Sequence, residues 1–149
     1  MSRIVWALLF GFSSVAGFHA VQASRVDAHQ NAARSTRAGT VTRLVAKDLP
    51  DAPGKEGLVE IVDFAPGESS QIHRHNADLF VYVLEGSVVT QVNGEALQTI
   101  APGGVFTESP ADVHTVSRNA SATEPAKLLV FYVKPKGAPP TVILKDGER

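Results

Sequence analysis

The sequence predicts an all-β fold with a single domain, built as a sandwich, jelly roll or small β-barrel. From Thr40 onward, short runs of β-branched and aromatic residues are separated by Gly, Pro and Asn. Closely spaced strands with turn residues between them are typical of these architectures. No stretch of ten or more residues in this region has helical periodicity. The length of 149 residues fits one domain.

Eight strands are expected, each in a run that favours extended backbone. The Asn93-Gly94 pair predicts a two-residue hairpin turn, since both central positions of such a turn need positive φ. The last strand is expected at a sheet edge or across the barrel. The expected strands are Thr40–Ala46, Leu58–Ala65, Phe80–Leu84, Ser87–Val92, Glu95–Ile100, Val113–Ser117, Leu128–Val133 and Thr141–Leu144.

Composition excludes several classes of function. The net charge is −1, from 14 basic and 15 acidic residues, and no basic block is present. A nucleic-acid partner is therefore not expected, because phosphate binding needs a surplus of Lys and Arg on one face. The absence of cysteine excludes disulfides, thiolate metal sites and a cysteine nucleophile. Any metal ion must be held by His, Asp, Glu or Gln.

The first residues have the pattern of a secretory signal peptide. Arg3 precedes the apolar run Ile4–Phe12, and small residues then lead to Val21-Gln22-Ala23. The alternative is a retained anchor, but the apolar run is shorter than the roughly 20 residues of a spanning helix. Cleavage after residue 23 predicts a periplasmic or secreted protein with no stable membrane insertion. Residues 24–39 are expected to form a polar arm or a short helix.

Three histidines predict a metal site. His73 and His75 are two residues apart, so in a strand their side chains lie on the same face. His114, in a later expected strand, can supply a third ligand. Three protein ligands with open positions are typical of a catalytic metal site, and imidazole binds Fe, Zn and related ions. The alternative is a pair of solvated histidines on a surface loop.

The surroundings of these histidines resemble the two sequence motifs of the cupin superfamily. Gly67, five residues, His73-Arg74-His75 and the run Asp78–Gly86 resemble the first motif, and Gly103, His114 and Asn119 resemble the second. The resemblance covers about residues 60–133. It implies a single-domain cupin jelly-roll β-barrel over residues 40–149, with a metal-centred cavity and His73, His75 and His114 as ligands.

The chain departs from the cupin pattern at Leu79, where the family usually has a Glu ligand. Gln71, Asp78 and Glu108 are the candidates for a fourth ligand or a general base. Gln71 has the parity of the two histidines, Asp78 would turn inward only at a bulge, and Glu108 precedes the turn that leads to His114. Without any of them, three neutral imidazoles and water would surround a divalent Fe, Mn or Zn ion, as in some thiol dioxygenases of the family.

Apolar residues are expected to line the same cavity. Leu79, Val81 and Val83 share the inward parity of the histidine pair, and Phe106 and Val116 are expected to join them. Such a lining favours an apolar or aromatic ligand. The alternative is that these five side chains only fill the barrel, as inward residues of small barrels usually do.

Two classes of function follow from this site. The first is a metal-dependent enzyme, dioxygenase-like, that acts on a small organic molecule. The second is a non-catalytic module that binds a small ligand or a metal ion. Cupins include both kinds, so the fold alone does not choose between them. The oligomeric state is left open by the sequence, but the resemblance implies a homodimer as one option, since cupins often pair through strands at the barrel edge and thereby cover exposed edges.

Overall fold

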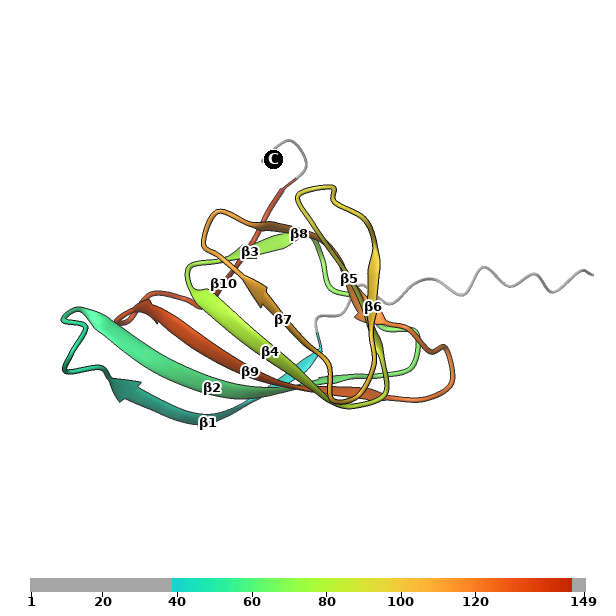
Figure 1. Ribbon diagram of the computed structural model, residues 1–149, viewed down its shortest axis with the longest axis horizontal. Helices are drawn as coiled ribbons and strands as arrows, with labels where there is room; N and C mark the ends of the chain where they lie inside the picture. The colour runs from blue at the N-terminus through green and yellow to red at the C-terminus, as the bar shows by residue number, and fades with distance from the viewer. Residues whose placement is uncertain (1–38, 146–149) are drawn as a thin grey trace, which may run out of the picture. The chain divides into compact units, whose positions relative to one another are not determined.

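The computed structural model describes residues 39–145, and this part of the chain is all-β. Ten strands form two five-stranded antiparallel sheets, which confirms the expected all-β jelly roll (Figure 1). The expected leader, residues 1–23, and residues 24–38 of the expected arm lie outside the described residues. Within residues 39–145, no helix is long and apolar enough to cross a membrane.

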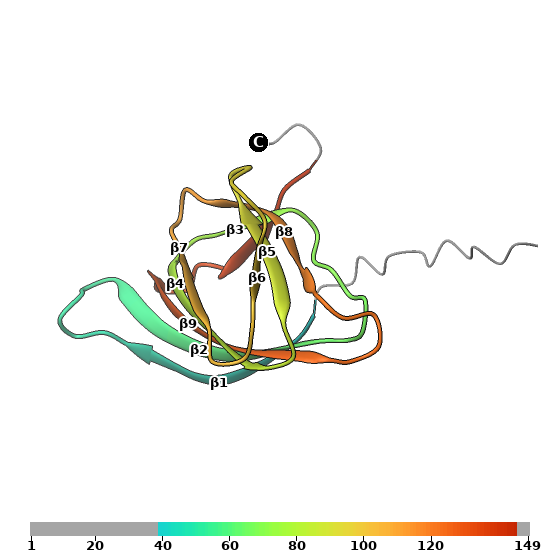
Figure 2. The same ribbon diagram turned by 45° about the vertical axis from the view of Figure 1, so that its right-hand side comes forward.

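The first sheet has the strand order β1-β2-β9-β4-β7, and the second has the order β10-β3-β8-β5-β6. Figures 1 and 2 show β2, β9 and β4 along one side of the barrel, with β3, β8 and β5 opposite. The strand bounds are β1 (Thr40–Asp48), β2 (Lys55–Phe64), β3 (His73–His75), β4 (Asp78–Glu85), β5 (Val88–Val92), β6 (Gln98–Ile100), β7 (Val105–Glu108), β8 (Val113–Asn119), β9 (Ala126–Pro135) and β10 (Thr141–Ile143).

The core lies between the two sheets and follows the period-two alternation of the strands. In β4 and β9, every second side chain is buried, while the residues between them face outward or are half-buried. The inward row of β2 adds two more core residues and one charged residue, Glu60. The core side chains from these strands are Leu58, Phe64, Leu79, Val81, Val83, Ala126, Leu128, Val130 and Tyr132.

Apart from shifts of a few residues at the strand ends, the elements differ from the sequence-based expectation in three places. Strands β3 and β7 were not among the expected runs, because three or four residues are too few to show a periodic pattern. The expected strand Glu95–Ile100 begins only at Gln98. The hairpin turn itself is confirmed, since Asn93 and Gly94 have φ values of 49° and 76°.

A bulge in β8 changes which of its residues face inward. Gln91 of β5 pairs with Val116, but the next residue, Val92, pairs with His114, so Thr115 is an extra residue in β8. One inserted residue reverses the inward–outward alternation beyond it. His114 and Ser117 therefore both line the barrel interior, whereas Val116 does not.

Candidate metal centre

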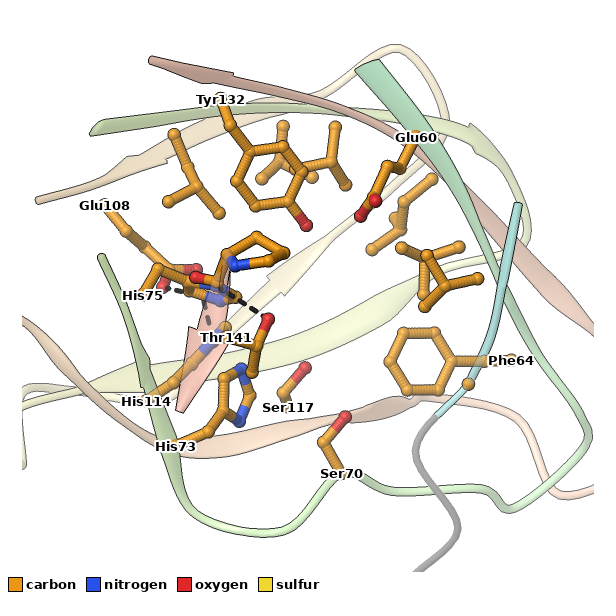
Figure 3. Close-up of a pocket in the computed structure, with 18 of the residues that line it drawn as sticks. Glu60, Phe64, Ser70, His73, His75, Glu108, His114, Ser117, Tyr132 and Thr141 are labelled. Atoms are coloured by element: carbon orange, nitrogen blue, oxygen red, sulfur yellow. Dashed lines mark hydrogen bonds and ion pairs between the residues drawn. The ribbon is translucent and has the colours of Figure 1, made fainter. Parts of the chain in front are cut away.

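The fold brings the three predicted histidines together on neighbouring strands. His73 and His75 lie in β3 and point to the same side, and His114 of β8 pairs directly with His73. One ring nitrogen from each histidine lies within 4.8 Å of the others, and all three side chains are buried. Figure 3 shows the three rings converging at one end of a pocket. This arrangement is a cluster that could hold a metal ion.

Hydrogen bonds set the orientation of the two β3 imidazoles. His73 Nδ1 lies 2.7 Å from the carbonyl oxygen of Gln71, and His75 Nδ1 lies 3.2 Å from that of Pro140. A carbonyl can only accept a hydrogen bond, so Nδ1 is the protonated nitrogen in both rings. Nε2 of each ring is then left with a free lone pair. Such partners on the far nitrogen are typical of metal-binding histidines.

His114 uses its nitrogens in the opposite sense. Its Nε2 lies 2.6 Å from Thr90 Oγ1, while its Nδ1 faces Glu108 at 3.1 Å from Oε1. With Nε2–H donating to the threonine hydroxyl, the lone pair of Nδ1 points toward the cluster. All three histidines can therefore present a lone pair to a common ion.

Glu108 supplies a carboxyl group at the same point. It lies in β7 opposite Leu79 of β4, and its Oε2 lies 3.7 Å from His75 Nε2. Within residues 39–145, Glu108 Oε2 and His114 Nδ1 are the buried side-chain atoms that have no hydrogen-bond partner. Burying a polar atom without a partner is costly. Three imidazoles and one carboxylate are ligands that Fe, Mn and Zn accept, so the donor set fits a divalent ion.

Burial suppresses every charge in the cluster. It lowers the pKa of His73, and together with the neighbouring histidines it lowers the pKa of His75 to about 4 and that of His114 to about 3. Burial, with a smaller contribution from Asp112, raises the pKa of Glu108 to about 8. Near neutral pH, the cluster without an ion therefore consists of neutral imidazoles and a neutral carboxyl. A bound cation would favour the ionised carboxylate.

The other two candidate ligands lie away from the cluster. The side chains of Gln71 and Asp78 are exposed. Gln71 precedes β3, and it contributes its backbone oxygen to His73 rather than its amide. Asp78 begins β4 in a regular register, so its side chain points away from the face that Leu79 occupies. The expected set of three imidazoles is thus joined by Glu108 and by neither of these residues.

The cluster opens into a pocket of about 200 Å³ between the two sheets. Three of the five expected lining residues, Leu79, Val81 and Phe106, do line it. Val83 does not, because it is fully buried in the core farther along β4. Val116 does not, because the β8 bulge turns it toward a separate hollow beside Leu97.

The pocket also holds polar residues that the sequence analysis did not single out. Glu60 of β2 and Tyr132 of β9 are buried in its wall, and of the two only Glu60 lies away from the histidine pair of β3 (Figure 3). The signal for Glu60 was present, since it has the same strand parity as the apolar Leu58 and Val62. A charged residue in an apolar row that faces a barrel interior is a candidate for function.

Comparison with known proteins identifies the family. The cupin domain family matches residues 60–132. Tetracenomycin polyketide synthase protein TcmJ from Streptomyces glaucescens is 30% identical over 134 residues, which are 89% of this chain and 86% of that protein. The chain belongs to the cupin superfamily.

Solved structures share the fold of this cupin. DMSP lyase DddQ from Ruegeria pomeroyi has a TM-score of 0.59 and 17% identity over 75% of this chain, which spans 54% of the lyase. A cupin-like protein from Thermotoga maritima has a TM-score of 0.56 and 22% identity, covering 72% of this chain and 79% of that protein. These likenesses show that the barrel of this cupin is the one its sequence motifs imply.

Proposed function

We propose that this cupin is an exported enzyme that uses one divalent transition metal ion, Fe, Mn or Zn, to act on a small organic molecule in a dioxygenase-like reaction. The observation that supports this is the convergence of three imidazole lone pairs and the unpartnered carboxyl of Glu108 at the end of a mostly apolar pocket. His73, His75 and His114 would hold the ion.

An ion in this place would supply a Lewis acid and, as iron, access to oxygen chemistry. The residues of the protein orient the imidazoles, adjust the charge of the site and can accept a proton. The far nitrogens of the histidines are anchored, so the rings are held in place before an ion arrives. Beside a bound ion, Glu108 would be ionised and would lower the net charge of the site by one unit compared with three neutral imidazoles alone. A carboxylate in this place can also accept a proton from a bound substrate.

The pocket walls favour a substrate with an apolar or aromatic body. Leu79, Val81 and Phe106 line the pocket, and Phe106 packs against His114 with ring centroids 6.4 Å apart. The relative TcmJ is a polyketide synthase protein by name. Phenolic and other ring compounds are therefore the first substrates to test.

Metal content is the deciding measurement. We expect about one iron, manganese or zinc ion per chain in protein expressed from the full sequence and purified without chelator. A His73→Ala/His75→Ala/His114→Ala variant should hold none, and Gln71→Ala, a matched surface substitution, should keep the wild-type content. Lack of metal in the wild type, even after titration, would contradict the metal site.

Two further measurements on the same preparation test the finer parts of the proposal. Substrate-dependent oxygen uptake with the iron form supports the dioxygenase-like enzyme, whereas tight ligand binding without turnover supports the non-catalytic module. The intact mass of the exported protein tests the leader. A mass that corresponds to residues 24–149 supports cleavage after Ala23, and the full-length mass contradicts it.

A further inference from the structure

We propose that Glu60 and Tyr132 form a second polar subsite in the pocket, which binds a neutral hydroxyl group of a substrate whose other end reaches the histidines. The claim that the other end of the substrate reaches the histidines rests on the proposed function. The hydroxyl subsite itself rests on the geometry of Glu60 and Tyr132 and does not need a metal ion.

Glu60 is placed where a barrel residue is normally apolar. It lies on the inward row of β2 between Leu58 and Val62, lines the pocket, and is only 4% exposed. Its ion pair is with Arg43 of β1, with 3.6 Å between Arg43 Nε and Glu60 Oε1. Burying a carboxylate is costly, and one long contact to a largely exposed arginine compensates for it poorly. A contribution to the stability of the fold therefore does not explain why a carboxylate occupies this position.

Tyr132 connects this carboxylate with the histidine end. Its ring packs against His75 with centroids 5.8 Å apart, and its hydroxyl points toward Glu60 in Figure 3. A phenol is protonated near neutral pH, so this hydroxyl can donate a hydrogen bond to the carboxylate that it faces. While its hydrogen is donated to Glu60, the oxygen of the Tyr132 hydroxyl can still accept a hydrogen bond from a ligand.

The chemistry of the pair selects a neutral hydrogen-bond donor. Glu60 can only accept, and Tyr132 can accept after donating to Glu60, so a ligand group here must donate. The net charge of the Glu60–Arg43 pair is zero, although the long contact does not offset the cost of burying the carboxylate. An ammonium group would therefore lose its water without meeting a net negative charge. A hydroxyl group meets both conditions. The neighbouring pocket walls are apolar and would contact the body of the ligand: Val62, Phe64, Leu128 and Val130.

The test compares ligands that differ only in the para group, using the zinc-loaded full chain. The probes are benzoate, 4-hydroxybenzoate, 4-(hydroxymethyl)benzoate and 4-(aminomethyl)benzoate, with Kd measured by calorimetry. We expect at least one hydroxyl probe to bind about 10-fold more tightly than benzoate, because a hydrogen bond to a charged group is being gained. The amine should bind more weakly than the hydroxymethyl probe. Benzoate binding as tightly as both hydroxyl probes, or the amine binding most tightly, would overturn the assignment.

Variants test which residues cause the preference for a hydroxyl group. Glu60→Leu keeps the size of the side chain, and Arg43 remains in contact with water, so the fold should survive. Both Glu60→Leu and Tyr132→Phe should reduce the hydroxyl preference to about 2-fold or less, while Ser117→Ala, which removes another pocket hydroxyl, should keep it. If Glu60→Leu shows no cooperative unfolding transition, it is not properly folded, and the binding data for Tyr132→Phe then decide whether the subsite exists. Preference retained in the folded variants would overturn the subsite.

Failure of the metal site and failure of this subsite give different results. One zinc per chain without hydroxyl preference overturns the subsite and leaves the proposed metal site standing. Should no zinc bind, the neutral probes p-cresol and toluene are compared in wild type and Glu60→Leu. A cresol-to-toluene affinity ratio that falls in the variant supports the subsite without the metal, and an unchanged ratio overturns it.

Discussion

Thr90 determines which nitrogen of His114 faces the pocket. Its hydroxyl lies 2.6 Å from Nε2, on the side of the ring away from Glu108. Accepting Nε2–H keeps the lone pair of Nδ1 directed at the cluster and holds the ring in position. This single side chain therefore couples β5 to the candidate ligand in β8.

Replacing Thr90 by Val should weaken metal binding while preserving the fold. The two side chains have nearly the same shape, but Val cannot accept the hydrogen bond from Nε2–H. Loss of such a partner typically reduces metal affinity by about 10–100-fold. Competition titration with a chromophoric chelator measures this change. Thr115→Val is the matched control, because the Thr115 hydroxyl bonds to Gln91 rather than to a histidine; an equal loss in both variants would contradict the role of Thr90.

At the scale of residues, the sequence predicted the histidines better than their partners. Spacing alone places His73 and His75 on one face, because alternation in a strand is a local property. Glu108 was one of three candidates, since choosing among them requires the pairing of β7 with β4. Glu60 was missed although its parity marked it, because only the pocket shows that it has Tyr132 as a neighbour.

Among the connecting elements, the turn from β4 to β5 is the most constrained by sterics. Gly86 has φ of +65°, and a Cβ atom there would lie 2.4 Å from the carbonyl oxygen of Pro125 and 2.8 Å from Ala126 Cα. Both obstacles are backbone atoms, which cannot rotate away. The turn thus packs directly on the start of β9, and only glycine allows this approach.

Gly86→Ala should destabilise the barrel by about 3 kcal/mol or more, since it adds a backbone clash to the cost of positive φ. Gly67→Ala is the matched control, because Gly67 has φ of +70° and nothing lies within 4 Å of its Cβ position. The control should lose only about 1–2 kcal/mol. Urea unfolding of both variants measures the difference, and equal losses would show that the clash is relieved.

At the scale of elements, the regular strands were predictable and the irregular ones were not. Long runs such as β9 show their alternation in the sequence, and Asn93-Gly94 shows its turn. The β8 bulge has no signal of its own, because one extra residue becomes visible only against the partner strand. That is why the sequence placed Val116 in the pocket and overlooked Ser117.

For the molecule as a whole, the cluster makes stability depend on pH when no metal is bound. His75 and His114 have folded-state pKa values far below the usual 6.5, so the unfolded chain binds more protons than the folded one below about pH 6.5. Glu108 has a raised pKa, so the folded chain binds more protons between about pH 4.5 and 8. Stability is therefore lost on acidification through the histidines and on alkalinisation through Glu108.

Chelator-treated protein should accordingly be most stable near about pH 6.5, where the histidine loss ends and the Glu108 loss dominates. Thermal unfolding between pH 4 and 8.5 measures this profile. Glu108→Gln should abolish the decrease above pH 6.5 and keep the decrease on the acid side. A decrease on the alkaline side that persists in Glu108→Gln would assign that titration to another group.

The pairing of Glu108 with Leu79 has a consequence for the surface that a substrate meets. The carboxyl group comes from β7, so the β4 wall beside the histidines is hydrocarbon from Val81 to Leu79. In the usual cupin arrangement, that point of the wall has the carboxylate. A ring or alkyl group approaching along β4 in this protein can shed its water before it reaches the imidazoles. With the carboxyl group on β7 and not on the paired position of β4, the surface that leads to the histidines along β4 is apolar and not charged.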